Sequence, residues 1–239
     1  KLLFNKHLKE KEFLDIVYWT RTEFPQEEYP PKERVVFEGE GVFDAFMSGW
    51  SLETKKYTTD ITIKVLDEKQ ILIGRKKEFE EMTTILSRPN KNNALLIGEP
   101  GSGKNSLVEA LALNSYLGSV QESIAHKRVY QLMVGFLVAG VKEMGDLQAR
   151  LENILEELSH AGNVILYIPD LENILGSTSF HIDLTGALIP YLRGKHIPII
   201  TSITPAAYRN YAEQTGSFIE LFEAVRVEPL EREDAVQML

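Results

Sequence analysis

The sequence has 239 residues, of which 44% are hydrophobic and 26% are charged, and this composition is typical of a globular protein of one or two domains. The lack of cysteine excludes a disulfide framework and a thiolate metal site, and no apolar run approaches the roughly 18 residues that a membrane-spanning helix requires. The 35 acidic and 26 basic residues leave a formal net charge of −9, which argues against a nucleic-acid partner bound by a broad basic face. We therefore expect a cytoplasmic protein with neither nucleic acid nor a membrane as its partner.

Residues 1–70 are predicted to form a small, mainly helical N-terminal segment and a linker. Apolar residues follow helical spacing over residues 1–24, and residues 25–41 have the proline, glycine and glutamate content of a linker. Residues 42–50 fit a short helix that ends at Gly49. Because this segment is too short for a sizeable core, we expect its aromatic side chains to pack on the following domain or on a partner.

From residue 71 onward, short apolar runs alternate with amphipathic segments. The predicted strands cover residues 94–97, 128–133, 164–168, 197–201 and 225–227. The predicted helices cover residues 75–87, 104–117, 146–160, 183–192 and 205–214. Wholly apolar strands between helices indicate a parallel sheet covered on both faces, so residues 71–239 are predicted to be one α/β domain.

A phosphate-binding loop follows the first of these apolar runs. Its sequence is Gly98-Glu99-Pro100-Gly101-Ser102-Gly103-Lys104-Asn105, which has the G-x-x-x-x-G-K spacing of a P-loop. The glycines permit a tight turn that points backbone N–H groups at one centre, and the following helix adds the positive end of its dipole. A glycine-rich turn without a ligand is the alternative. The strand before and the helix after favour a nucleotide site, whose predicted residues are Gly98, Pro100, Gly101, Ser102, Gly103, Lys104, Asn105 and Ser106.

Residues from about 55 to 239 resemble the first ATPase module of Clp-type AAA+ unfoldases. The matching motifs are Ile73-Gly74-Arg75, Lys91-Asn92-Asn93, Gly98-Glu99-Pro100-Gly101, Val108-Glu109-Ala110-Leu111-Ala112, Leu137-Val138-Ala139-Gly140, the run 162–168, and Thr201-Ser202-Ile203-Thr204 with Tyr208-Arg209. The resemblance implies a three-layer P-loop AAA+ fold with a parallel central sheet, ATP or ADP as ligand, and a homo- or hetero-oligomeric ring of protein subunits. Leu72 and Ile73 fall where the family packs the adenine ring, although plain core packing is the alternative.

The residues that would bind Mg²⁺ and activate water depart from the family pattern. Asn105 replaces the P-loop Ser or Thr, and Ser106 is rotated about 100° away on the helix. Pro169 and Asp170 replace the Walker B Asp-Glu pair, so proline offers no ligand and Asp170 is shorter than the family's glutamate. A one-residue slip would give Asp170 the metal role and leave the base missing, and a solvated strand-end acid is a further alternative. The candidate Mg²⁺ ligands are thus Asn105 and Asp170, and we expect Mg²⁺ to bind weakly or not at all.

The sensor 1 position keeps the residue type that the family uses, whereas the arginine-finger and pore-loop positions do not. Thr204 fits the sensor 1 position that orients water, so the candidate catalytic residues are Asp170 and Thr204, although a helix cap is the alternative role for Thr204. Glu220 and Leu221 fall on the positions of the arginine fingers. The pore loop is predicted at Lys142, Glu143 and Met144, with Glu143 where the family has an aromatic side chain.

The sequence therefore predicts a nucleotide-binding AAA+ module with weak or absent ATP hydrolysis and a role in assembly or regulation. The alternatives are an active ATP-dependent unfoldase and a scaffold that binds no nucleotide. The final residues 231–239 fit the first turns of a helix, so we expect the chain to be part of a longer protein whose helical lid begins near Leu239.

Overall fold

A computed structural model of the chain describes residues 54–68, 75–141, 143–175, 183–194, 197–214 and 216–229. The chain divides into two units, Lys1–Gly41 and Val42–Leu239, and every described residue belongs to the second. The helices predicted within residues 1–24 and 42–50 lie outside the described residues. Among the residues that are described, no helix has the length and apolar character needed to cross a membrane.

One six-stranded sheet with the order β1-β3-β4-β5-β2-β6 forms the centre of the described unit. Its strands are β1 (Thr58–Asp60), β2 (Ala94–Ile97), β3 (Arg128–Leu132), β4 (Val164–Ile168), β5 (Ile199–Ile203) and β6 (Glu223–Arg226). All neighbouring strands run parallel except β1, which pairs antiparallel with β3. Strands β2, β4 and β5 are buried along their whole length, as their apolar sequences predict, and the predicted α/β class is confirmed.

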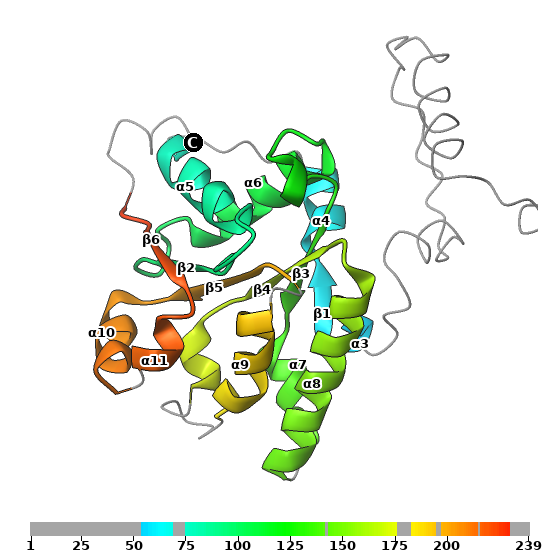
Figure 1. The fold of residues 1–239 in the computed structure, drawn as a ribbon, viewed down its shortest axis with the longest axis vertical. Coiled ribbons are helices and arrows are strands. Elements are labelled where there is room, and N and C mark those ends of the chain that lie inside the picture. The colour runs from blue at the N-terminus through cyan, green and yellow to red at the C-terminus, as the bar shows by residue number, and fades with distance from the viewer. Residues whose placement is uncertain are drawn as a thin grey trace, which may run out of the picture. The chain divides into compact units, whose positions relative to one another are not determined.

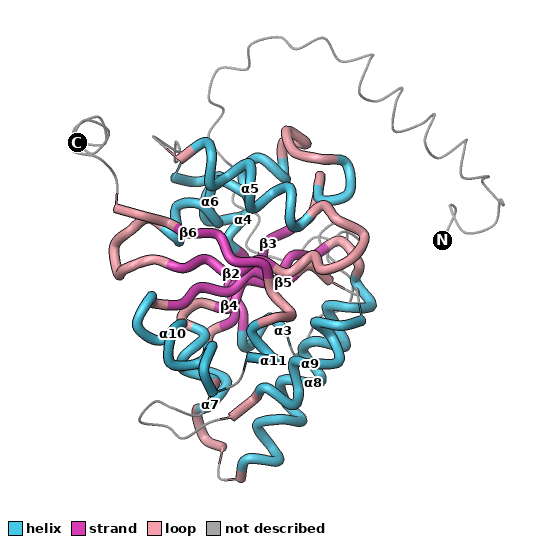
Figure 2. The backbone as a smooth tube through the Cα atoms, turned by 60° about the vertical axis from the view of Figure 1, so that its left-hand side comes forward, coloured by secondary structure: helices cyan, strands magenta, loops and turns pink. Residues whose placement is uncertain are grey.

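Helices cover both faces of this sheet (Figures 1 and 2). One layer contains α4 (Ile61–Glu68), α5 (Lys76–Leu86) and α6 (Lys104–Tyr116). The other contains α3 (Thr54–Tyr57), α7 (Val134–Val138), α8 (Met144–Ala161), α9 (Thr185–Gly194), α10 (Pro205–Gln214) and α11 (Gly216–Ile219). Short 3₁₀ turns, η1 (Glu122–Ile124) and η2 (Leu171–Ile174), complete the described elements. The three-layer arrangement expected from the sequence is therefore the observed one.

Each face of the sheet has its own apolar core. The first core joins α4, α5 and α6 to the sheet, and its buried side chains include Ile61, Met82 and Leu107. The second joins the opposite face to α8, α9 and α11, and its buried side chains include Leu151 and Phe218. Both cores are needed because a parallel sheet with two apolar faces must bury each of them.

Residues 54–68 differ from the sequence expectation, which placed them in the N-terminal segment before a boundary at residue 71. In the structure β1 pairs with β3, and Thr62 Oγ1 accepts a hydrogen bond of 3.0 Å from the Val129 backbone N–H. Asp60 also forms an ion pair with Arg128, with 3.2 Å between Oδ2 and Nη1. The strand has three polar residues, and the helix after it has only eight residues, so neither is long enough to show an extended periodic pattern.

Two isoleucines of α4 test whether this segment is an integral part of the domain. Ile61 is 3% exposed in the core beneath α4, whereas Ile63 is 49% exposed. We expect Ile61→Ala to lower the free energy of unfolding by about 2–5 kcal/mol, because it removes buried methyl groups and leaves a cavity. The matched variant Ile63→Ala should change it by about 0.5 kcal/mol or less. Urea denaturation measures both values, and equal effects would contradict the placement of α4 in the core.

Candidate functional site

The ends of three parallel strands bring the predicted site residues together. The P-loop follows β2, Pro169 and Asp170 follow β4, and Thr204 follows β5. Because these strands are parallel and adjacent, their carboxyl ends share one edge of the sheet. The Gly98 backbone N–H donates a hydrogen bond of 3.2 Å to the Ile203 carbonyl, which joins the start of the P-loop to the residue before Thr204.

Close packing and positive φ angles require glycine at three positions of the P-loop. Gly101 and Gly103 have φ angles of 79° and 91°, in the left-handed region. A Cβ atom on Gly98 would lie 2.5 Å from both Ser102 Oγ and the Val227 carbonyl oxygen. A Cβ atom on Gly103 would lie 2.9 Å from Arg75 Nε. The loop is therefore held from outside by the residues after β6 and by the buried Arg75 side chain.

The P-loop and the start of α6 carry several hydrogen-bond donors. Lys104 is only 8% exposed, and its ammonium group donates to the carbonyl oxygens of Gly98 and Glu99 over 2.7 and 2.9 Å. Ser102 Oγ is buried and has no hydrogen-bond partner among the described residues. No side chain caps the N-terminus of α6, which begins at Lys104 after Gly103. Free donors, a positive dipole end and an ammonium group fit a phosphate chain.

A chain of hydrogen bonds crosses from α6 to the ends of β4 and β5. The Tyr167 hydroxyl donates to Asn105 Oδ1 over 2.7 Å and lies 3.2 Å from Ser202 Oγ. The Asp170 backbone N–H donates to the same Ser202 oxygen over 3.0 Å. The Asn105 oxygen, a candidate Mg²⁺ ligand from the sequence, is thus already bound to a protein donor.

Burial makes the Tyr167 hydroxyl a weaker acid than an exposed tyrosine. The pKa of the Tyr167 hydroxyl is raised to about 12, mainly by desolvation; the hydrogen bond with Ser202 lowers it, and the nearby carboxylates of Asp170 and Glu109 contribute to the rise. The hydroxyl therefore keeps its proton at neutral pH and remains a donor to Asn105.

The candidate catalytic residues have other roles in the described contacts. Asp170 is exposed and has left-handed backbone angles, φ 47° and ψ 64°, at the start of η2. Thr204 Oγ1 accepts a hydrogen bond of 3.3 Å from the Ala207 backbone N–H, so it caps the first turn of α10. Pro169, at the end of β4, has no side-chain atom that could ligate a metal.

The remaining predicted residues lie away from this centre or outside the described residues. Leu72, Ile73 and Lys142 fall outside them. Glu143 is exposed just before α8, and Met144, its first residue, is 40% exposed. Glu220, at an expected arginine-finger position, is exposed in the turn after α11.

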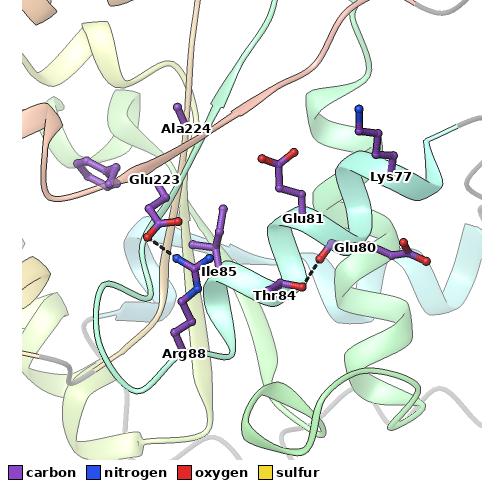
Figure 3. Close-up of a pocket in the computed structure, with 9 residues that line it drawn as sticks. Lys77, Glu80, Glu81, Thr84, Ile85, Arg88, Glu223 and Ala224 are labelled. Carbon is purple, nitrogen blue, oxygen red and sulfur yellow. Dashed lines mark hydrogen bonds and ion pairs between the residues drawn. The ribbon is translucent and has the colours of Figure 1, made fainter.

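A pocket of about 370 Å³ adjoins the start of the P-loop. Gly98 and Glu99 line one part of it, and Tyr208, Arg209 and Arg226 line another. A separate pocket of about 580 Å³ lies between α5 and β6, where Arg88 and Glu223 form an ion pair (Figure 3). None of the residues that line this second pocket belongs to the P-loop, so it is distinct from the candidate nucleotide site.

Sequence comparison identifies the family. The profile of the ATPase family associated with various cellular activities (AAA) matches residues 94–211. The chain is 36% identical over 183 residues to the chaperone protein ClpB of Oceanobacillus iheyensis, and 35% identical over 170 residues to the negative regulator of genetic competence ClpC/MecB of Bacillus subtilis. The described unit is an AAA ATPase domain related to the Clp and Hsp104 chaperones. This confirms the family expected from the motifs.

Comparison of structures agrees with this assignment. The AAA domain is similar to the S. cerevisiae Hsp104–ADP complex, with a TM-score of 0.70 and 27% identity over 77% of this chain and 26% of the Hsp104 chain. It is also similar to the closed state of Hsp104 with ATPγS and FITC casein, with a TM-score of 0.71. The matches to ClpB and ClpC/MecB cover 75% and 70% of this chain but only 23% and 21% of those relatives. The chain therefore spans about a quarter or less of the relatives' length.

Sequence reasoning missed Tyr167 and Ser202 as site residues. Both lie in buried, largely apolar strands, where the hydroxyl groups of Tyr167 in β4 and of Thr201 and Ser202 in β5 interrupt the apolar runs. A buried hydroxyl needs a hydrogen-bond partner, so a polar side chain within a strand that is predicted to be fully buried could have indicated these two residues. Arg75 and Val227 were also missed as supports of the P-loop, because their contacts with Gly103 and Gly98 join segments distant in sequence.

The P-loop packing predicts a large effect for an alanine at Gly98. We expect Gly98→Ala to lower the free energy of unfolding by about 1–3 kcal/mol, because the new Cβ atom overlaps the fixed Val227 carbonyl. Gly186→Ala is the matched control, since a Cβ atom in α9 would meet nothing within 4 Å. In urea denaturation that variant should be as stable as the original chain or slightly more so. A Gly98→Ala variant of undiminished stability would contradict the described loop geometry.

The raised pKa of Tyr167 predicts a loss of stability in alkali. Folding favours the protonated hydroxyl, so its contribution is complete below pH 10 and is lost as the pH rises through about 12. We expect this residue to account for about 2 kcal/mol of the fall in the free energy of unfolding between those values. Tyr167→Phe should lack that part of the fall. Identical pH profiles for the two proteins, measured by denaturant titration, would contradict the assigned environment.

Proposed function

We propose that this AAA domain binds ATP or ADP through its P-loop, hydrolyses ATP little or not at all, and serves in the assembly or regulation of a larger chaperone or unfoldase. One contrast within the site carries the proposal. Lys104 and the glycines that shape the loop are retained, whereas Asn105 Oδ1 is bound to Tyr167 and Pro169 stands at the end of β4.

The binding half of the proposal rests on the donors of the P-loop. The Lys104 ammonium group is buried beside the loop carbonyls, and the first turn of α6 has no side-chain cap. Ser102 adds a buried hydroxyl without a partner among the described residues. A bound phosphate chain would accept hydrogen bonds from these groups in a setting where charge-assisted bonds are strong. Membership of the AAA family itself implies nucleotide binding.

The hydrolytic half rests on the groups available at the ends of β4 and β5. Water attack requires a carboxylate that orients or deprotonates the water, and such a group typically contributes a factor of about 10²–10⁴. Asp170 is the acid nearest to that position, but its backbone is left-handed and its N–H is bound to Ser202. Thr204 caps α10, and Glu220 stands where the family carries the arginine finger that acts on a neighbouring subunit's nucleotide. We infer that the site also holds Mg²⁺ weakly or not at all.

A role in assembly or regulation follows from a site that binds without turnover. A bound nucleotide then stabilises one arrangement of the domain and is not consumed. We expect the partners to be protein subunits, either copies of this chain or related active modules. The cytoplasm is the compartment that we expect.

Calorimetric titration with ATP and ADP, together with a phosphate-release assay on the same samples, tests this proposal. We expect Lys104→Ala to weaken binding about tenfold to a hundredfold, because it removes a charged donor to the phosphates. The matched control Lys77→Ala, an exposed lysine of α5, should bind like the original chain. Phosphate release should be no faster for the original chain than for Lys104→Ala.

Two results would contradict the proposal in different ways. Phosphate release that depends on Lys104 would show an active ATPase and would direct attention to Asp170 as the replacement base. Unchanged binding in Lys104→Ala, or no binding of either nucleotide, would favour a scaffold that does not use its P-loop.

A further inference from the structure

The hydrogen-bond chain beside the P-loop has a fixed direction. Its first member is the backbone N–H of Asp170, which can only donate, and it donates to Ser202 Oγ. The Tyr167 hydroxyl has one proton and two acceptors in reach, Asn105 Oδ1 at 2.7 Å and Ser202 Oγ at 3.2 Å. When it donates to the nearer Asn105, the Ser202 hydroxyl can donate to the Tyr167 oxygen. In this order every hydroxyl donates once and accepts once, so no buried proton lacks an acceptor.

The direction of the chain sets the orientation of the Asn105 amide. Because Oδ1 faces Tyr167, the two N–H bonds of Nδ2 form the free end of the chain. Asn105 is the second residue of α6, directly after Lys104, and it is exposed. Its Nδ2 has no hydrogen-bond partner among the described residues. The side chain therefore adds a donor to the first turn of the helix, which directly follows the P-loop glycine Gly103.

This arrangement suits a phosphate oxygen better than a metal ion. A hard cation requires oxygen lone pairs, and an amide N–H offers none. The hydrogen bond from Tyr167 leaves Oδ1 a second lone pair, but it holds that oxygen toward β4 and leaves Nδ2 as the free end of the side chain. At the neighbouring position Pro169 supplies no carboxylate to hold the water shell of a metal. The donor set thus fits a nucleotide's phosphates and does not fit Mg²⁺.

We propose that the P-loop of this domain takes nucleoside di- or triphosphates in their metal-free form, with Asn105 Nδ2 donating to a phosphate oxygen where AAA ATPases hold Mg²⁺. Tyr167 and Ser202 act as positioning residues, since they fix the amide and touch no ligand. The inference rests on the proposed function, because it requires binding at the P-loop. Beyond that function, it states that the bound nucleotide carries no metal and that Asn105 is the residue that favours this form.

Mass action predicts how much Mg²⁺ should change the apparent Kd for ADP. If only free nucleotide binds, the apparent affinity falls in proportion to the fraction of nucleotide left without metal. At a Mg²⁺ concentration that complexes nine-tenths of the ADP, the apparent Kd should be about tenfold higher than in EDTA. A site that takes the Mg²⁺ complex and the free form equally would give the same Kd in both solutions.

Calorimetric titrations with ADP in EDTA and at the Mg²⁺ concentration that complexes nine-tenths of the ADP test this with three variants. Tyr167→Phe releases the amide, which can then turn its oxygen outward, so the Kd should become nearly independent of Mg²⁺. Tyr130→Phe makes the same change in the buried strand β3 and should keep the roughly tenfold difference. Asn105→Ala, at an exposed position where folding is not at risk, should weaken binding in EDTA about tenfold by removing a donor to a charged group.

The outcomes separate this inference from the proposed function. Binding that depends on Lys104 and is tighter in Mg²⁺ than in EDTA would overturn the inference alone. An unchanged Mg²⁺ effect in Tyr167→Phe, with normal binding in Asn105→Ala, would overturn the role of the hydrogen-bond chain. Binding that is absent, or independent of Lys104, in both solutions would overturn the proposed function and the inference together.

Discussion

The parallel pairing of β4, β5 and β2 is the constraint on which the candidate site depends. It places the P-loop, the turn at Pro169 and the cap at Thr204 at one edge of the sheet. The Val227 carbonyl and the Arg75 side chain then press against Gly98 and Gly103, so the loop has little freedom to change shape. A phosphate site of this kind needs no movable side chains other than lysine, because its donors belong to the backbone.

The same edge accounts for the two halves of the proposed function, nucleotide binding and weak or absent turnover. The phosphate donors depend on backbone geometry, which survives substitution of the residues around it. Metal binding and water activation depend on single side chains, and here those positions hold Asn105 and Pro169. The Tyr167 hydroxyl joins Asn105 to Ser202 and to the Asp170 N–H, so a network of protein hydrogen bonds already reaches the oxygen of the candidate metal ligand Asn105. Burial raises the pKa of Tyr167 and keeps this network protonated.

Sequence patterns predicted the strands with wholly apolar runs, the helices of the two layers, the P-loop and the family. They failed for β1 and α4, because Thr58–Asp60 is short and polar and is recognised as a strand only through its pairing with β3. They also left Asn105 as a candidate Mg²⁺ ligand, because a one-dimensional pattern cannot show that its oxygen accepts a hydrogen bond from Tyr167. Contacts between distant segments, such as Arg75 with Gly103, are set by packing and leave no local periodicity.

A crystal structure of this chain grown with ADP and excess Mg²⁺ tests the central claim most directly. Our account predicts Asn105 Nδ2 within about 2.7–3.2 Å of a phosphate oxygen, with the Tyr167 hydroxyl still bound to Oδ1. It also predicts that Lys104 reaches the phosphates and that no metal lies next to Asn105. A Mg²⁺ ion with octahedral ligands at about 2.0–2.1 Å, one of them Asn105 Oδ1, would contradict it.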